Sequence, residues 1–380
     1  MKKISNLLIL AVLAIGMGLT SCEGALDDIL GEWSRPTPGT PSKNPSENPE
    51  SPASPLATPL TLEAITDGTI TVENPKPSMK YSLNGGAKSA VTTNPINVVV
   101  GDKVQFYGAE TQYSDGITST KIVGVTAQVK VYGNIMSLLD ETGYETKTDL
   151  PNEPLVFSCL FYGNTKLTDA SGLLLPAETL TDNCYSGMFQ NCTALTAAPK
   201  LPAETLAEGC YNSMFYGCTS LTTAPELKAE TLAESCYCNM FDGCTSLTTA
   251  PELKATTLAY GCYDSMFKGC TSLTTAPELK ATTLAQDCYT RMFEGCTSLT
   301  TAPELKAENL AEKCYFRMFQ GCTKLTTAYV KAGYDTNCAD MFNGCTATGA
   351  KLHTTSGNYG SWDLAITGNS WSNWTVEDDY

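Results

Sequence analysis

The chain has 380 residues, and its 40 acidic and 24 basic side chains give a formal net charge of −16 at pH 7. A polyanion of that size repels nucleic acid and anionic lipid headgroups, so we expect no nucleic-acid partner. The single histidine, His353, lies among Thr and Gly near the C-terminus, which argues against Ser-His-Asp or Cys-His catalysis and against a His-rich metal site. We therefore expect a protein that is not an enzyme, without catalytic residues, metal or cofactor.

Residues 1–21 have the layout of a secretion signal. Lys2 and Lys3 precede an uncharged apolar stretch, residues 7–19, which is shorter than the roughly 20 apolar residues that span a bilayer. Small residues then precede Cys22, and this order resembles the lipobox of bacterial lipoproteins. The resemblance implies that Cys22 is acylated and ties the protein to a membrane. An ordinary signal peptide followed by an incidental cysteine is the alternative.

Residues 22–58 are rich in Pro, Ser, Asn and Glu. Such a segment buries too little apolar surface to offset its ordering entropy, so we expect a disordered stalk behind the lipidated N-terminus. The acidic pair Asp27-Asp28 resembles the surface-export signal of Bacteroidetes-type lipoproteins, although residues 24–26 separate it from Cys22. The resemblance implies a lipid-anchored protein of the outer membrane that is exposed at the cell surface.

Residues 59–132 alternate between apolar and polar side chains in the manner of β-strands. Turn signals such as Asp67-Gly68, Asn84-Gly85 and Gly101-Asp102 separate the alternating runs. This spacing predicts a small all-β, sandwich-like domain that spaces and caps the part that follows.

A 26-residue internal repeat dominates the rest of the chain. A unit of this length cannot bury its own apolar residues, so the units must stack into a solenoid, which we place at residues 133–350. Degenerate copies at residues 160–168 and 338–345 serve as capping units, and residues 351–380 form a C-terminal cap. Within a unit, the apolar side chains of residues 262–270 predict a short helical or 3₁₀ segment, and the Thr-rich stretch after them predicts a strand. The six full units begin at Leu175, Leu201, Leu227, Leu253, Leu279 and Leu305.

The repeat resembles a known family. Its pattern is similar to the BspA-like leucine-rich repeats of bacterial surface proteins, Ile-Pro-x-x-Val-x-x-Ile-Gly-x-x-Ala-Phe-x-x-Cys-x-x-Leu, over about residues 155–350. The resemblance implies a leucine-rich-repeat solenoid of parallel strands with short helical or 3₁₀ segments, and a binding role, because the better-known members bind host matrix proteins. One departure is that Cys replaces the inward Ile of the family in every full copy. The matching residues of one unit are Leu201-Pro202, Leu206, Cys210, Met214-Phe215, Cys218 and Leu221.

Most of the 17 cysteines occur as one pair per unit. Export would make disulfides possible, and the leading copy lacks both members of the pair, so we predict a bond within each unit. Because eight residues of helix would separate the Cα atoms by about 12 Å, beyond the limit of roughly 7 Å, such a bond requires the segment to turn. A column of buried free thiols is the alternative. The pairs are Cys184/Cys192, Cys210/Cys218, Cys236/Cys244, Cys262/Cys270, Cys288/Cys296, Cys314/Cys322 and Cys338/Cys345.

The Thr-rich side of the units is nearly constant and predicts a binding face. Regular columns of Thr and Glu, beside Lys, suit a repetitive ligand such as a polymer or a fibrous protein; alternatively, they only solubilise the sheet. The predicted face consists of Thr222, Thr248, Thr274, Thr300, Glu226, Glu252, Glu278 and Glu304.

These features predict a surface module that adheres to host or matrix macromolecules, with an extracellular protein or glycan as its partner. Two alternatives are a glycan-capture lipoprotein of a nutrient-uptake system and a structural spacer without a ligand. Trp362, Trp371 and Trp374 are expected to form a hydrophobic cap, and a sugar-stacking platform is the alternative.

Overall fold

The computed structural model describes residues 55–368 and 371–380, which belong to one compact unit, Ala53–Tyr380. The predicted signal at 1–21, the acylation site Cys22, the Asp27-Asp28 pair and most of the predicted stalk lie outside the described residues. The stalk was predicted to reach residue 58, but a 3₁₀ turn, η1 (Pro55–Ala57), precedes that point. The Ala57 carbonyl accepts a 2.7 Å hydrogen bond from the Tyr144 hydroxyl, so the folded part starts earlier than residue 59.

The N-terminal part is built from two antiparallel sheets with a shared apolar core. One sheet has the order β4-β3-β6-β1-β8, and the other has the order β5-β2-β7. Alternate residues such as Leu62, Val104 and Ile70 are buried, as expected for sheets that cover one core. The strands are β1 (Thr61–Ala64), β2 (Gly68–Glu73), β3 (Lys80–Leu83), β4 (Ser89–Ala90), β5 (Ile96–Val98), β6 (Lys103–Tyr107), β7 (Lys121–Gly124) and β8 (Val129–Asn134).

The first sheet continues into the repeat. Strand β9 (Leu167–Leu174) pairs in parallel with β8 and is the sixth strand of that sheet. Two 3₁₀ turns, η2 (Ile135–Leu138) and η3 (Tyr144–Thr146), lie between the sheet and the first coil. The first hydrogen bond between consecutive coils runs from the Leu155 N–H to the Asp182 backbone carbonyl at 2.9 Å. Stacking therefore starts some twenty residues after the predicted boundary at residue 133.

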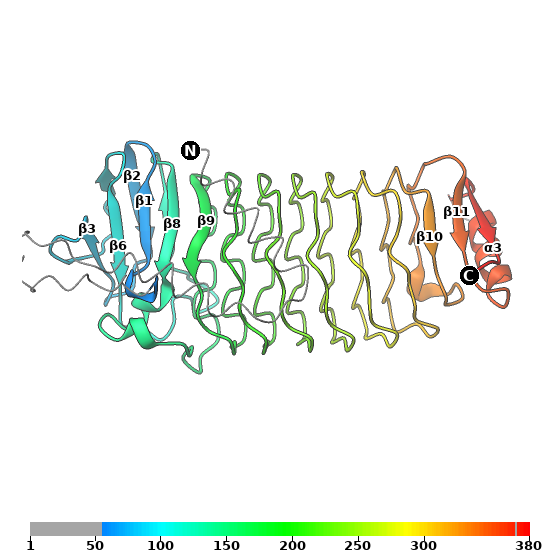
Figure 1. Ribbon diagram of the computed structural model, residues 1–380, viewed down its shortest axis with the longest axis horizontal. Helices are drawn as coiled ribbons and strands as arrows, with labels where there is room; N and C mark the ends of the chain where they lie inside the picture. Colours follow the sequence, from blue (N-terminus) through cyan, green and yellow to red (C-terminus); the bar gives the residue numbers. More distant parts are fainter. Residues whose placement is uncertain (1–54, 369–370) are drawn as a thin grey trace, which may run out of the picture. The chain divides into compact units, whose positions relative to one another are not determined.

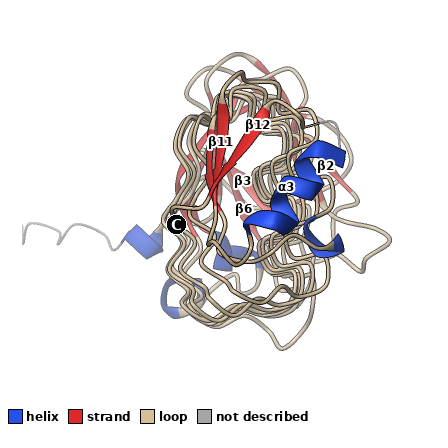
Figure 2. Cartoon of the chain, turned by 90° about the vertical axis from the view of Figure 1, so that its right-hand side faces the viewer, coloured by secondary structure: helices blue, strands red, loops and turns tan. Residues whose placement is uncertain are grey.

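From residue 155 the chain winds in coils, mostly of 26 residues, that lie side by side along the unit (Figure 1). Viewed along the stack, successive coils follow nearly the same outline (Figure 2). Parallel bridges join equivalent residues of neighbouring coils, for example Thr223 to Thr249 and Thr249 to Thr275. The bridges stay isolated, whereas the sequence predicted continuous strands.

Proline explains why the strands stay short. The Thr-Thr-Ala stretch of most units is followed by a proline, which has no N–H to donate to a ladder. The last full unit has Tyr329 at this place, and there a regular strand, β10 (Thr327–Tyr329), forms.

In the six full units the predicted helical or 3₁₀ segment does not form, whereas the degenerate copy at residues 338–345 begins with a 3₁₀ turn, η4 (Thr336–Cys338). Residues 259–270 and their equivalents, called the turn segment below, form a run of tight turns without a helix. Alternate N–H groups donate hydrogen bonds to carbonyls of the same coil, as Met266 does to the Tyr263 carbonyl (3.2 Å). The others donate to carbonyls of the next coil, as Phe267 does to the Met292 carbonyl (3.0 Å). In a helix, each interior N–H donates to a carbonyl of the same helix. Here half of the N–H groups donate to the next coil instead, so hydrogen bonds between coils replace those of a helix.

The turns require a positive φ at every fourth residue. In one unit φ is +54° at Gly261, +55° at Ser265 and +68° at Gly269. Glycine adopts this conformation without strain, whereas a side chain such as that of Ser265 costs roughly 1–2 kcal/mol. The Gly residues of the repeat therefore mark turn positions.

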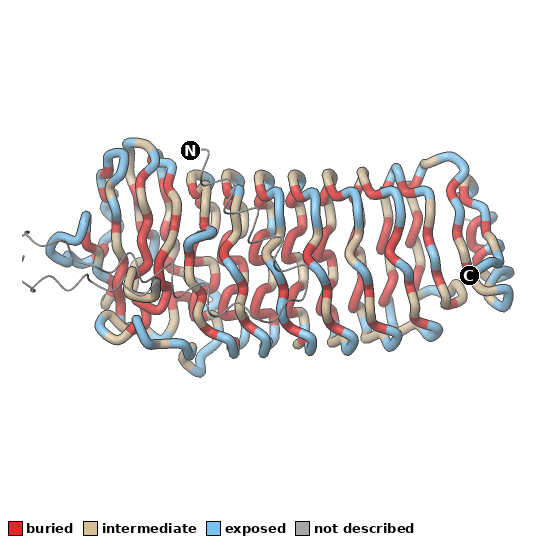
Figure 3. The backbone as a smooth tube through the Cα atoms, viewed as in Figure 1, coloured by how far each residue is buried: buried red, intermediate tan, exposed pale blue. Residues whose placement is uncertain are grey.

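Two aromatic columns run through the core inside the coils, and buried segments recur at matching places in successive coils (Figure 3). Phe rings from Phe161 to Phe342 stack at centroid distances between 5.4 and 5.8 Å. A second column, from Tyr185 to Tyr315, continues through Phe157 to Tyr113 of the N-terminal part, with spacings between 5.8 and 6.2 Å. The Tyr113 side chain of the β-sheet part therefore covers the N-terminal end of this column in the first coil.

The C-terminal end extends the stack and then closes it. After η4 (Thr336–Cys338), strands β11 (Ala350–His353) and β12 (Trp374–Glu377) add to β10 in parallel, and helix α3 (Tyr359–Gly368) packs beside β12. Trp362, Trp371 and Trp374 are at most 4% exposed and surround Phe342, so they offer no platform to a sugar. Among the residues described, no helix has the length and apolarity needed to cross a bilayer.

Candidate binding face

The predicted glutamates form a regular ladder with lysines. The carboxylate of Glu226 lies 2.9 Å from the ammonium group of Lys254. Lys254 belongs to the next coil and stands two residues after the position equivalent to Glu226. Glu252 with Lys280 and Glu278 with Lys306 repeat the contact at 2.6 Å. The glutamate side chains remain 60–66% exposed, so the pairs stabilise the fold little and leave the carboxylates open to a ligand. We call these three pairs, together with Glu304, the Glu–Lys ladder.

The lysines hold the ladder carboxylates ionised. A hydrogen bond from Lys254, followed by its charge, lowers the pKa of Glu226, and Lys280 and Lys306 do the same for Glu252 and Glu278. A ligand on this side of the coils therefore meets alternating fixed charges, one pair per coil, at about the 4.8 Å spacing of parallel strands.

The two ends of the ladder differ from its middle. At the C-terminal end Ala332 stands where a lysine would face Glu304, and the Tyr380 hydroxyl donates to the Glu304 carboxylate at 2.6 Å instead. At the N-terminal end Lys200 stands where a glutamate would face Lys228. Lys200 and Lys228 have no ion pair with any residue that the structure describes.

The predicted threonines form a second column, four residues before the ladder glutamates along the chain, and all four are exposed. The Thr248 hydroxyl donates to the Thr222 carbonyl of the previous coil at 3.3 Å. Because the donor points back into the stack, the hydroxyl oxygen keeps its acceptor capacity towards solvent. The structure thus gathers the eight predicted face residues into two exposed columns, Thr222, Thr248, Thr274 and Thr300 in one and Glu226, Glu252, Glu278 and Glu304 in the other.

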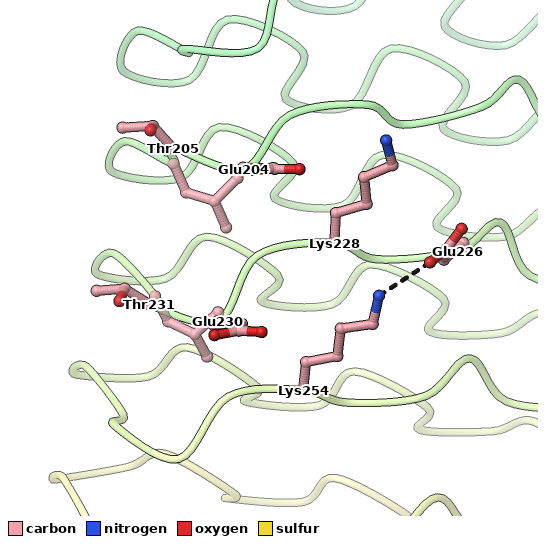
Figure 4. Close-up of a pocket in the computed structure, with 9 residues that line it drawn as sticks. Glu204, Thr205, Glu226, Lys228, Glu230, Thr231 and Lys254 are labelled. Atoms are coloured by element: carbon pink, nitrogen blue, oxygen red, sulfur yellow. Dashed lines mark hydrogen bonds and ion pairs between the residues drawn. The ribbon is translucent and has the colours of Figure 1, made fainter.

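A polar groove of about 750 Å³ lies beside the N-terminal end of the ladder (Figure 4). Carboxylates, ammonium groups and threonine hydroxyls line it together with two leucines, and neither Ser, Cys nor His is among the lining residues. This composition suits the binding of a polar ligand. The lining residues are Glu204, Thr205, Leu206, Glu226, Lys228, Glu230, Thr231, Leu232 and Lys254.

The repeat cysteines are free thiols in the structure, whereas the sequence predicted a disulfide bond within each unit. The Cys244 S–H donates to the Phe215 carbonyl of the previous coil at 3.1 Å, and the equivalent thiols from Cys192 to Cys345 do likewise. The free thiols include Cys184, Cys192, Cys210, Cys218, Cys236, Cys244, Cys262, Cys270, Cys288, Cys296, Cys314, Cys322, Cys338 and Cys345.

The second thiol of each unit contacts the previous coil and not its partner in the predicted bond. Burial raises the pKa of Cys270 well above its usual value, and the next contributions come from Cys296 and Cys244, one coil to either side. Cys262, its partner in the predicted bond, does not contribute. The turn segment therefore separates the two cysteines of a unit into two columns, and burial keeps both protonated.

Several features escaped the sequence interpretation. The Tyr column could have been found from the Cys-Tyr dipeptide that all six units share. His353 also has contacts that the sequence did not indicate, because its ring stacks on Tyr329 at a centroid distance of 4.4 Å and Nδ1 lies 2.6 Å from the Asp379 carboxylate. Within residues 55–368 and 371–380, no three His, Cys, Asp or Glu side chains gather as metal ligands would.

Comparisons of the chain with protein-family models, with curated proteins and with solved structures found no match. The resemblance to BspA-like repeats therefore depends on the repeat pattern alone.

Proposed function

We propose that this chain is a cell-surface lipoprotein whose leucine-rich-repeat solenoid, of the BspA-like type, adheres to host or matrix macromolecules. The observation that carries the proposal is the pair of exposed columns, threonine and glutamate, that cross successive coils at one spacing. A surface that repeats itself along one axis matches a ligand that also repeats, such as a fibrous protein or a polymer. A binding module rather than an enzyme fits such a surface, because catalysis requires groups that converge at one point.

The anchor is a separate part of the proposal. Acylation of Cys22 would hold the protein at the outer membrane, with the solenoid exposed outside the cell. Incorporation of labelled fatty acid that is lost in a Cys22→Ser variant tests the anchor. Protease treatment of intact cells tests the exposure, and an uncut protein would contradict it.

The binding test uses the full-length protein and two matched variants. The face variant carries Glu252→Gln and Glu278→Gln. The control variant carries Glu208→Gln and Glu234→Gln, which remove the same charge from exposed positions at the start of the turn segment. Each protein is titrated against immobilised matrix proteins and a glycan array at physiological salt.

We expect saturable binding to a matrix protein that weakens in the face variant and persists in the control. Equal binding by both variants would contradict the assignment of the face. Binding to glycans alone would favour a glycan-capture lipoprotein of a nutrient-uptake system. Absence of binding to either panel would favour a structural spacer.

A further inference from the structure

The regular pairing of the Glu–Lys ladder stops at its N-terminal end, where two lysines have no ion-pair partner among the residues that the structure describes. Lys200 and Lys228 stand in the same relation, 28 residues apart, as Glu226 and Lys254, which form an ion pair. Two ammonium groups in this arrangement repel each other, and Figure 4 shows the Lys228 side chain without the dashed contact that joins Lys254 to Glu226. At this end of the ladder, two ammonium groups therefore stand where the next coils have a neutral pair.

Cavities lie at this end of the ladder. The 750 Å³ groove includes Lys228. A second depression of about 460 Å³ includes both Lys200 and Lys228, together with Glu226, whose carboxylate is paired with Lys254. Proline rings line the second depression, among them Pro202 and Pro225, which are half-buried. Pro202 occupies the position that Lys228 takes in the next unit, and Lys200 occupies the position of Glu226. The first difference adds an apolar ring to the floor of the depression, and the second adds its positive charge.

The two cavities present complementary chemistry within one site. The lysines donate charge-assisted hydrogen bonds to an anion. The proline rings offer a flat apolar surface, and the carboxylates of Glu204 and Glu230 in the adjoining groove accept hydrogen bonds from hydroxyl groups. An anionic group, an apolar ring face and several hydroxyl donors are combined in an acidic sugar.

We propose that Lys200 and Lys228 form the anion subsite for an acidic sugar, with its carboxylate or sulfate group between the two ammonium groups and its hydroxyls towards Glu204 and Glu230. This inference deepens the proposed function, and rests on it in treating this side of the coils as a binding face. An acidic peptide fits less well, because its further carboxylates would meet Glu204, Glu226 and Glu230. The net charge of −16 likewise disfavours a densely charged polymer.

The repeat itself supplies the decisive variant. Lys200→Glu restores the residue that the later units carry at this position, so it should form the missing ion pair with Lys228 and leave the melting temperature unchanged or higher. The same change removes the subsite. Lys228→Gln is a second loss variant, and Lys280→Gln is the control, because Lys280 occupies the same column within an intact part of the ladder.

Full-length protein is titrated with four probes: a disaccharide with one glucuronic acid, a monosulfated disaccharide, the uncharged disaccharide and a Glu-rich peptide. We expect at least one charged disaccharide to bind about tenfold or more tightly than the uncharged one, and to weaken by a similar factor in Lys200→Glu and Lys228→Gln but not in Lys280→Gln. Binding should also weaken at high salt. Preference for the carboxylate or for the sulfate identifies the source of the anion.

Three results would overturn the inference: Lys200→Glu binds like the wild type, the uncharged disaccharide binds as well as the charged ones, or the peptide binds best. If a matrix protein still binds the Lys200→Glu variant, only this inference fails. If a charged disaccharide binds through the lysines but no macromolecule binds, the subsite stands and the adhesion proposal fails.

Discussion

Replacing Cys236 and Cys244, separately and together, decides whether the repeat cysteines act alone or as bonded pairs. Both thiols are fully buried, and Cys244 donates to the Phe215 carbonyl, which also accepts the Cys218 N–H at 3.0 Å. Cys244→Ala therefore leaves that carbonyl satisfied and loses mainly the packing of one sulfur atom. The loss of one buried heavy atom costs about 1 kcal/mol, and Cys236→Ala should cost a similar amount.

Free thiols in separate columns predict additive costs, so the double variant should lose about 2 kcal/mol with a coupling energy below roughly 0.5 kcal/mol. A disulfide that closes a loop of this length would contribute about 2.6 kcal/mol. Either single variant would then lose that contribution as well as its packing, and the second replacement would add little.

Urea unfolding of the four proteins, with and without reductant, measures the coupling, and thiol counting on denatured protein provides an independent check. A coupling energy above about 2 kcal/mol that disappears in reductant would refute the free-thiol arrangement and restore the bond predicted within each unit.

Other predictions concern the turn segment, a buried acid and the C-terminal cap. Ser235 has φ +51° in a column where Gly209 and Gly261 are its neighbours. Ser235→Gly should therefore stabilise the fold by about 0.5–1 kcal/mol, and Gly261→Ala should destabilise it by about 1 kcal/mol. Urea midpoints of the two variants that move in the same direction would contradict this. Burial raises the pKa of Asp242 to about 6, so the folded state holds the proton more tightly than the unfolded chain, and the resulting stability is present below about pH 4 and lost as the pH rises through 6. Asp242→Asn should therefore be more stable than the wild type at pH 7, by about 1–2 kcal/mol, with a difference that vanishes at pH 4 in thermal melts. Trp362 is fully buried and its indole N–H donates to the Ala332 carbonyl at 2.9 Å, so Trp362→Ala should cost about 3–5 kcal/mol in urea unfolding; a cost below 1 kcal/mol would show that α3 does not close the stack.

Periodicity along the sequence predicted the features that depend on one coil at a time. The 26-residue spacing indicated which residues share a column, and inward residues such as Met266 and Phe267 are buried as a column requires. Exposure of the Thr and Glu columns could be predicted in the same way, since a polar side chain that recurs in every unit has no other place than the surface.

Features that depend on contact between coils could not be read from one unit. The turn segment looks helical in sequence because its apolar residues recur at helical spacing, but half of its N–H groups bond to the next coil. Likewise, the sequence places Cys262 near Cys270, whereas the Cys270 thiol donates to the Phe241 carbonyl of the previous coil at 3.2 Å.

The clearest case is Lys200, which in the sequence is one of many surface lysines. Only the stacking of coils places it against Lys228, where the next three coils have a glutamate against a lysine. A repeated sequence determines the periodic surface by itself, because each coil presents the same face. A site that differs from its neighbours depends on which residues of two coils meet, and the tertiary structure alone decides that.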